Sequence, residues 1–166
     1  MLNKKESYNV AVVGATGIVG ESLLEILCSR SFPIDSIHAI ASQRSKGSKA
    51  KFGDQLITVE ALDEFDFSTI DIAFFSAGSS VSKEYATKAA SLGCIVIDNT
   101  SEFRYEDNIP LIVPEVNPQD ISSYKDTNII ANPNCSTIQM LVALKPLHDT
   151  FCVEHINVST YQAVSG

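Results

Sequence analysis

Residues 10–20 read Val10-Ala11-Val12-Val13-Gly14-Ala15-Thr16-Gly17-Ile18-Val19-Gly20, a short apolar run followed by a turn with three glycines. An amphipathic stretch follows from residue 18 to about residue 29, so the segment predicts a strand, a turn and a helix in succession. Glycine lets the backbone turn tightly and lets a pyrophosphate approach the N–H groups at a helix N-terminus. The spacing G-x-x-G-x-x-G differs by one residue from the usual dinucleotide fingerprint, and such turns also serve only to pack a helix on a strand. After the first strand of an α/β chain, the turn favours dinucleotide binding.

Strand-like and helix-like segments alternate along the rest of the chain. We expect strands at residues 10–13, 37–41, 57–59, 71–75, 94–98, 129–130 and 153–164, and helices at residues 18–29, 81–92 and from position 135 onward. Near-continuous apolar strands alternating with helices indicate a parallel sheet covered on both faces. The predicted fold class is α/β: a Rossmann-like, doubly wound, mostly parallel sheet with helices on both faces over residues 1–150. Residues 151–166 are expected to be the first strand of a truncated second α+β domain.

The composition narrows the class of protein. The chain has 166 residues, 45% of them apolar, which suits one globular domain with a real core. Its net charge of -8 and its lack of Lys/Arg blocks argue against a nucleic-acid partner. The apolar runs are too short to span a bilayer and the N-terminus lacks the apolar region of a signal peptide, so we expect a cytoplasmic protein without a membrane partner. The four scattered cysteines indicate free thiols, with neither disulfides nor a metal site.

The segment after the second expected strand indicates which dinucleotide is bound. It reads Ala41-Ser42-Gln43-Arg44-Ser45-Lys46-Gly47, with two cations and no acid where an NAD site would place Asp or Glu for the ribose. Arg44, with the hydroxyls of Ser42 and Ser45, suits a 2′-phosphate through charge-assisted hydrogen bonds. The alternative is a solvated basic loop. NADP is therefore favoured over NAD.

The next strand end carries small residues. It reads Ser76-Ala77-Gly78-Ser79-Ser80, which suits close approach to the cofactor ribose or nicotinamide. An ordinary helix N-cap by Ser79 or Ser80 is the alternative, and it is compatible with the first role.

A single arginine follows the strand after that, in Asp98-Asn99-Thr100-Ser101-Glu102-Phe103-Arg104. Arg104 suits bidentate binding of a phosphate or carboxylate. The alternative is a surface arginine paired with Glu102 or Glu106. Judged on these residues alone, the surface ion pair is the safer interpretation.

The hexapeptide Asn132-Pro133-Asn134-Cys135-Ser136-Thr137 joins a strand-like run to a helix-like one. Because Pro133 disfavours helix at the residue before it, the helix is expected to start at or just after Asn134. Cys135 then sits at a helix N-terminus, which stabilises a thiolate, the usual cysteine nucleophile for an acyl carbon. The alternative is a small buried hydrophobe.

Together these segments resemble aspartate-semialdehyde dehydrogenase, in order and over nearly the whole chain. The resemblance is carried by residues 14–20, 42–45, 76–80, 98–104, 113–117 (Val-Pro-Glu-Val-Asn), 132–137 and 159–166 (Ser-Thr-Tyr-Gln-Ala-Val-Ser-Gly). It implies that Cys135 is the acylated nucleophile, that Asn134 positions substrate and that Gln162 orients the reacting group. By the same resemblance, Arg104 contacts the phosphate-bearing substrate or inorganic phosphate. The expected NADP-binding residues are Gly14, Thr16, Gly17, Ile18, Val19, Gly20, Ser42, Arg44, Ser45, Ala77 and Gly78.

The resemblance implies NADPH-dependent reductive dephosphorylation of aspartyl phosphate to aspartate semialdehyde through a cysteine thioester, a step in the biosynthesis of lysine, threonine, methionine and isoleucine. A homodimer or homotetramer is expected for the full-length enzyme. One alternative is N-acetyl-glutamyl-phosphate reductase, whose cysteine segment usually has glycine at the position of Asn134. The other is a non-catalytic NADP-binding module.

The chain stops at Gly166, inside the family's Gln-Ala-Val-Ser-Gly segment. In that family the following domain supplies the acid/base histidine and a second substrate-binding arginine, so we expect the chain alone to be inactive. His38, His148 and His155 are interpreted as structural. The apolar face of the strand expected at residues 153–164 is predicted to form an association-prone edge.

Overall fold

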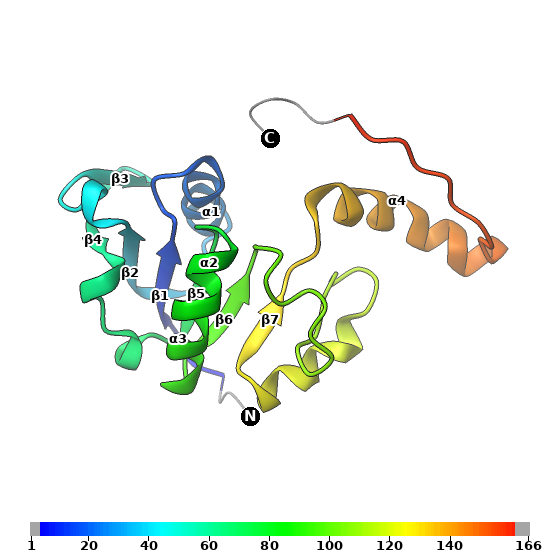
Figure 1. The fold of residues 1–166 in the computed structure, drawn as a ribbon. Helices are drawn as coiled ribbons and strands as arrows, with labels where there is room; N and C mark the ends of the chain where they lie inside the picture. Colours follow the sequence, from blue (N-terminus) through cyan, green and yellow to red (C-terminus); the bar gives the residue numbers. More distant parts are fainter. Residues whose placement is uncertain (1–3, 162–166) are drawn as a thin grey trace.

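The computed structural model describes residues 4–161, which form a seven-stranded sheet with helices on both sides (Figure 1). The strands are β1 (Tyr8–Val13), β2 (Ile34–Ala41), β3 (Lys49–Phe52), β4 (Gln55–Ala61), β5 (Ile72–Phe75), β6 (Ile95–Asp98) and β7 (Ile129–Ala131). Their order in the sheet is β3-β4-β2-β1-β5-β6-β7, and every neighbouring pair is parallel except β3 with β4. The predicted mostly parallel, Rossmann-like sheet is confirmed.

The helices are α1 (Ile18–Ser29), α2 (Ser79–Val81), α3 (Thr87–Ser91) and α4 (Cys135–Phe151). A π-helical turn, η4 (Ser82–Ala86), joins α2 to α3. Short 3₁₀ turns are η1 (Gln43–Ser45), η2 (Leu62–Glu64), η3 (Phe67–Thr69) and η5 (Pro118–Asp126). Within residues 4–161, no helix combines the length and the apolar character that a membrane crossing requires.

Both faces of the sheet are buried, as the central strand β1 shows. Val10 and Val12 pack in one cluster with Leu24 of α1, whereas Ala11 and Val13 pack in a second cluster with the alanines of η4 and α3. All four β1 side chains are inaccessible to solvent. Because successive side chains of a strand point to opposite faces, α1 and the α2–α3 segment must cover opposite sides of the sheet.

The edge of the sheet differs from the prediction, because β3 and β4 form an antiparallel hairpin where the pattern predicted one short strand. The register pairs Phe52 with Gln55 across the two-residue loop Gly53-Asp54. Gly53 has a φ of +58°, which favours glycine. A Gly-Asp pair between two strand-like runs is a known hairpin signal, and it was present in the sequence.

The helix expected at residues 81–92 is also interrupted. It runs as α2, η4 and α3, with the wider turn of η4 in the middle. This turn brings Ser82 into the core, where its side chain is fully buried. Such turns inside helices often lie at functional sites.

The expected strand at residues 153–164 is wrong for the part that the structure describes. Residues 153–161 carry no strand pairing, and Tyr161 is 99% exposed. A strand forms only where a neighbour pairs with its N–H and C=O groups, and no described strand lies beside this segment. Residues 162–164 lie outside the described residues, and the domain boundary at residue 150 stays a prediction.

Candidate active site at the carboxyl ends of the parallel strands

The predicted site residues follow the strands at one edge of the sheet. From β1 the sheet order runs to β2 on one side and to β5 on the other, so β1 and β5 flank a topological switch point. In open α/β sheets, ligands bind outside the carboxyl ends of the strands at such a point. A ligand is therefore expected to contact the turns after β1, β2, β5, β6 and β7.

The glycine turn packs tightly against its neighbours. Gly14 has a φ of +91°, and a Cβ there would lie 2.9 Å from the Ser76 Oγ. A Cβ on Gly20 would lie 2.1 Å from the Gly14 carbonyl oxygen. The N–H groups of Gly14 and Ala15 both donate to the Ile40 carbonyl, at 2.8 and 3.1 Å. Glycine is thus required at positions 14 and 20 by contacts within the fold.

The same turn leaves the start of α1 open. Gly17 is the N-cap and makes no side-chain cap, while Thr16, Gly17, Ile18 and Val19 are exposed. The N–H groups of Ile18 and Val19 have no hydrogen-bond partner among residues 4–161. Unpaired N–H groups and the positive end of the helix dipole together suit a phosphate. The residues therefore fit the pyrophosphate of a dinucleotide.

The two cations of the loop after β2, Lys46 and Arg44, have different surroundings. Lys46 Nζ pairs with Glu64 Oε2 at 2.5 Å, and this hydrogen bond, a second from Gln43 and the Lys46 charge hold the pKa of Glu64 below its usual 4.5. Arg44 is exposed, with no acidic partner in the described part of the chain. Of the two cations, Arg44 is the one left to face a ligand.

The loop after β5 is tied to β1. The N–H and the hydroxyl of Ser76 both donate to the Val13 carbonyl, at 2.9 and 3.0 Å. Gly78, with a φ of +100°, is the N-cap of α2 and no side chain caps the helix. The alternative of a cap by Ser79 or Ser80 is therefore wrong. Ala77 and Gly78 are exposed beside the glycine turn, as a cofactor-binding role requires.

Arg104 is held by backbone carbonyls. Its Nε donates to the Asn132 carbonyl at 3.0 Å and its Nη2 donates to the Asn99 carbonyl at 3.2 Å. The ion pair with Glu102 or Glu106, which the sequence favoured, does not form among the described residues. Since a guanidinium has five N–H groups, three remain without a partner there. The arginine is thus fixed in place and still able to bind an anion.

A cavity of about 360 Å³ lies beside this guanidinium. Val19 of α1, Ser76 and Gly78 after β5, and Asn99 and Arg104 after β6 line it. The glycine turn and the arginine, which are far apart in the sequence, therefore border one space. Asn99 was not singled out from the sequence, although its place directly after a strand is a usable signal.

Cys135 is the first residue of α4, directly beyond β7. Asn134 is the N-cap, and its Oδ1 accepts hydrogen bonds from the Ser136 N–H at 3.0 Å and the Ser136 hydroxyl at 2.6 Å. The predicted helix start is confirmed. The thiol is exposed, so the alternative of a small buried hydrophobe is wrong. Gln162 lies outside the described residues.

Two of the histidines lie on elements away from these strand ends. His38 Nδ1 lies 2.8 Å from Glu60 Oε1 within the sheet, and His148 is in the last turn of α4. Among residues 4–161, no group of three or more His, Cys, Asp or Glu side chains is arranged to hold a metal ion.

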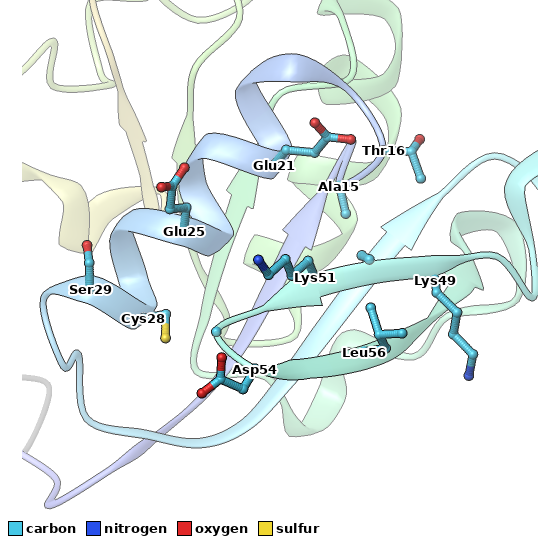
Figure 2. A pocket seen from close by; sticks show the side chains of 12 residues that line it. Ala15, Thr16, Glu21, Glu25, Cys28, Ser29, Lys49, Lys51, Asp54 and Leu56 are labelled. Atoms are coloured by element: carbon cyan, nitrogen blue, oxygen red, sulfur yellow. The ribbon is translucent and has the colours of Figure 1, made fainter.

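A larger cavity, of about 750 Å³, is a separate feature (Figure 2). Figure 2 shows Glu21 and Glu25 on α1, and Lys51 and Asp54 on the neighbouring β3–β4 hairpin; all four line this cavity. This cavity contacts the glycine turn only at Ala15 and Thr16. Its wall carries charges of both signs and lies along the flank of α1, so we place the candidate site at the strand ends instead.

Comparisons with known proteins identify the family of the chain. Residues 9–124 match the family model described as semialdehyde dehydrogenase, NAD binding domain. Aspartate-semialdehyde dehydrogenase from Legionella pneumophila is 58% identical over 158 residues, which are 95% of this chain and 46% of that protein. The chain thus spans about half the length of the curated relatives it matches.

Two solved structures extend the comparison. Aspartate semialdehyde dehydrogenase II from Vibrio cholerae, complexed with ASA, has a TM-score of 0.84 and 54% identity, covering 87% of this chain and 47% of that one. Aspartate semialdehyde dehydrogenase from Candida albicans, with NADP, has a TM-score of 0.72 and 28% identity, covering 87% and 47%. The chain therefore belongs to the semialdehyde dehydrogenase family, and its residues 9–124 match that family's NAD-binding domain.

Proposed function

We propose that this chain is the cofactor-binding and nucleophile-bearing half of an NADP-dependent aspartate-semialdehyde dehydrogenase. The observation that carries the proposal is that the glycine turn, Arg104 and Cys135 all follow parallel strands ending at one edge of the sheet. The activity for which the relatives are named supplies the substrate class. The cytoplasmic location and the homo-oligomer expected for the full-length enzyme belong to the same proposal.

Different residues of the chain bind different parts of the cofactor. The open start of α1 receives the pyrophosphate, and the Ala77-Gly78 backbone leaves room for the nicotinamide ribose. Arg44, which lacks an acidic partner among residues 4–161, supports a 2′-phosphate and hence NADP. Ser42 and Ser45 flank it at the ends of η1.

The reaction uses Cys135 as a nucleophile. Its thiolate attacks the acyl carbon of aspartyl phosphate, the carbon–oxygen bond to phosphate breaks, and a thioester forms on Sγ. Bound NADPH supplies the hydride that reduces this thioester. The sulfur then leaves the carbon as the aldehyde forms, which restores the thiolate. The start of α4 favours negative charge at Sγ, and the unpaired N–H groups of Arg104 bind the phosphate or carboxylate of the substrate. Gln162 is proposed to orient the reacting group.

The test compares two exposed cysteines at opposite ends of one helix. In the full-length protein we expect Cys135→Ser to lower kcat for phosphate-dependent NADP reduction by at least about 10³-fold, the scale seen when a nucleophile is removed. Cys152→Ser, at the C-cap of α4, is the matched control and should leave kcat unchanged. NADP affinity, measured by calorimetry, should be the same in both variants. Equal activity of the two variants would refute the nucleophile assignment.

A second measurement uses the 166-residue chain itself and addresses the non-catalytic alternative. Near neutral pH, iodoacetamide should alkylate Cys135 faster than Cys152, because the two ends of a helix have opposite dipole charges. Equal rates at the two sites would favour a binding module in which Cys135 has no special reactivity.

A further inference from the structure

Asp98 is a buried carboxyl group without a basic partner. It ends β6, is inaccessible to solvent, and forms no ion pair within the described residues. Two hydroxyls hold it instead: Ser82 Oγ donates to Oδ1 at 2.6 Å and Thr100 Oγ1 donates to Oδ2 at 2.7 Å. Burying such a group is unfavourable, and a well-packed apolar residue would serve stability as well or better. Its presence beside the candidate site therefore calls for a role other than packing.

Thr100 connects Asp98 to the loop after β6 by hydrogen bonds. Its hydroxyl, which donates to Asp98, also accepts a hydrogen bond from the Glu102 N–H at 3.2 Å. The loop begins at Asn99, whose N–H donates to the Phe75 carbonyl at 2.8 Å. The turn from residue 99 to residue 102 is thus tied to β5 at its start and to Asp98 at its middle.

Arg104 depends on this turn and on a second segment that Asp98 also contacts. One guanidinium contact is the Asn99 carbonyl, at the start of the turn, and the other is the Asn132 carbonyl. The Asn132 N–H donates to the Asp98 carbonyl at 2.8 Å, and its side-chain amide donates to Asn99 Oδ1. Asp98 therefore contacts, through its main chain and its side chain, both segments that hold the guanidinium.

We propose that Asp98 and Thr100 are positioning residues, which fix the 99–102 turn and thereby aim the three unpaired N–H groups of Arg104 at a phosphate in the 360 Å³ cavity. The proposal rests on the proposed function only for the identity of the anion, which is inorganic phosphate or the phosphoryl group of the substrate. Asp98 itself is fully buried, so it acts through Arg104 and not by touching the ligand.

The fold supplies a matched control. Ser82 donates to the other oxygen of the same carboxylate, is buried as Thr100 is, and belongs to η4, which forms no hydrogen bond with Arg104. Thr100→Val and Ser82→Ala each remove one hydroxyl from Asp98. The two variants should therefore lose similar stability, while only Thr100→Val releases the turn.

The kinetic test uses the full-length protein and varies inorganic phosphate. We expect Thr100→Val to raise KM for phosphate about tenfold, on the scale expected when a binding group is misplaced by a fraction of an ångström. Ser82→Ala should leave this KM within about twofold, and Thr100→Ser should restore it. Asp98→Asn should match Thr100→Val, and the double variant should add little to either, because both act through one turn. Equal KM values in Ser82→Ala and Thr100→Val would overturn the proposal, as would additive effects of the two positioning variants.

A spectroscopic test keeps this inference separate from the proposed reaction. In the 166-residue chain, an Arg104 Nη2–H donates to the Asn99 carbonyl at the start of the turn, so its ¹⁵N–¹H signal should exchange slowly with water in the wild type and in Ser82→Ala. It should exchange fast in Thr100→Val. If the full-length protein reduces no NADP but these signals behave as expected, the proposed function fails and the positioning role stands. If all three proteins show the same exchange, the positioning role fails whatever the activity.

Discussion

Gly20→Ala tests how closely α1 packs against the glycine turn. The added Cβ would lie 2.1 Å from the Gly14 carbonyl oxygen and 2.7 Å from the Ala15 Cα, where ordinary contacts begin at 3.4 Å. Both neighbours are backbone atoms, so the helix start must move by more than about 1 Å, away from the sheet that buries Leu24 and Leu27. Overpacking of this kind costs about 1–3 kcal/mol, whereas the higher helix propensity of alanine returns at most about 1 kcal/mol. We expect a net loss of about 2 kcal/mol.

The free energy of unfolding is measured by urea denaturation, with circular dichroism as the signal. NADP affinity is measured on the same protein. In thermal unfolding, a loss of about 2 kcal/mol would lower the Tm of a domain of this size by about 6 °C. Gly17→Ala is the control, because its Cβ would lie 3.4 Å from the Gly14 oxygen, and its effect on stability should stay below about 1 kcal/mol. A Gly20→Ala protein as stable as the wild type would show that helix propensity outweighs the contact, and the packing argument would fail.

Three further predictions concern single ionisable groups. Burial, with a smaller effect of the Asp71 charge, raises the pKa of the Cys94 thiol from 9.0 to about 12, so only the unfolded chain loses this proton between those values. Stability should therefore fall with rising pH in that window, by up to about 1.4 kcal/mol per pH unit, and less steeply in Cys94→Ala, as urea titrations at each pH would show. Burial acts to raise the pKa of Asp71, but hydrogen bonds from Lys5 and the Asn9 N–H hold it below its usual 3.8. The stability that Asp71→Asn removes should thus be present above pH 3.8 and vanish on further acidification, and an unchanged difference at low pH would contradict this. Arg44→Gln should weaken NADP binding about tenfold or more and leave NAD binding unchanged in calorimetry, whereas equal losses for both would exclude a 2′-phosphate contact.

The sequence predicts the parts of the fold that depend on local patterns. The β1 run, the α1 helix and the start of α4 after Asn134 follow from periodicity, glycine and proline, whose effects act over a few residues. The hairpin at Gly53-Asp54 carried a local signal of the same kind that the prediction did not use.

The candidate site was harder to predict, as Arg104 illustrates. Its sequence neighbours include Glu102, which suggested a surface ion pair, yet its actual partners are main-chain carbonyls. One of these belongs to Asn132, 28 residues away. Main-chain groups carry no sequence signal, and the pairing of β6 with β7 that brings them together is a property of the whole sheet. The role of the buried Asp98 is hidden as well, since one of its two hydroxyl partners, Ser82, lies 16 residues away on η4.

β1 and α4, which lead into the glycine turn and bear Cys135 respectively, differ in burial and should therefore differ in the rate of amide hydrogen exchange. The amides of β1 lie in the centre of the sheet among side chains that solvent does not reach, whereas α4 has no buried residue within the described part of the chain (Figure 1). A helix whose best-covered side chains are only half-buried gains little stability from packing, and Pro146 removes one N–H from the hydrogen bonds of α4. In this chain the amides of α4 should exchange their hydrogens long before those of β1. The helix that bears Cys135 thus opens more readily than the strand that leads into the glycine turn.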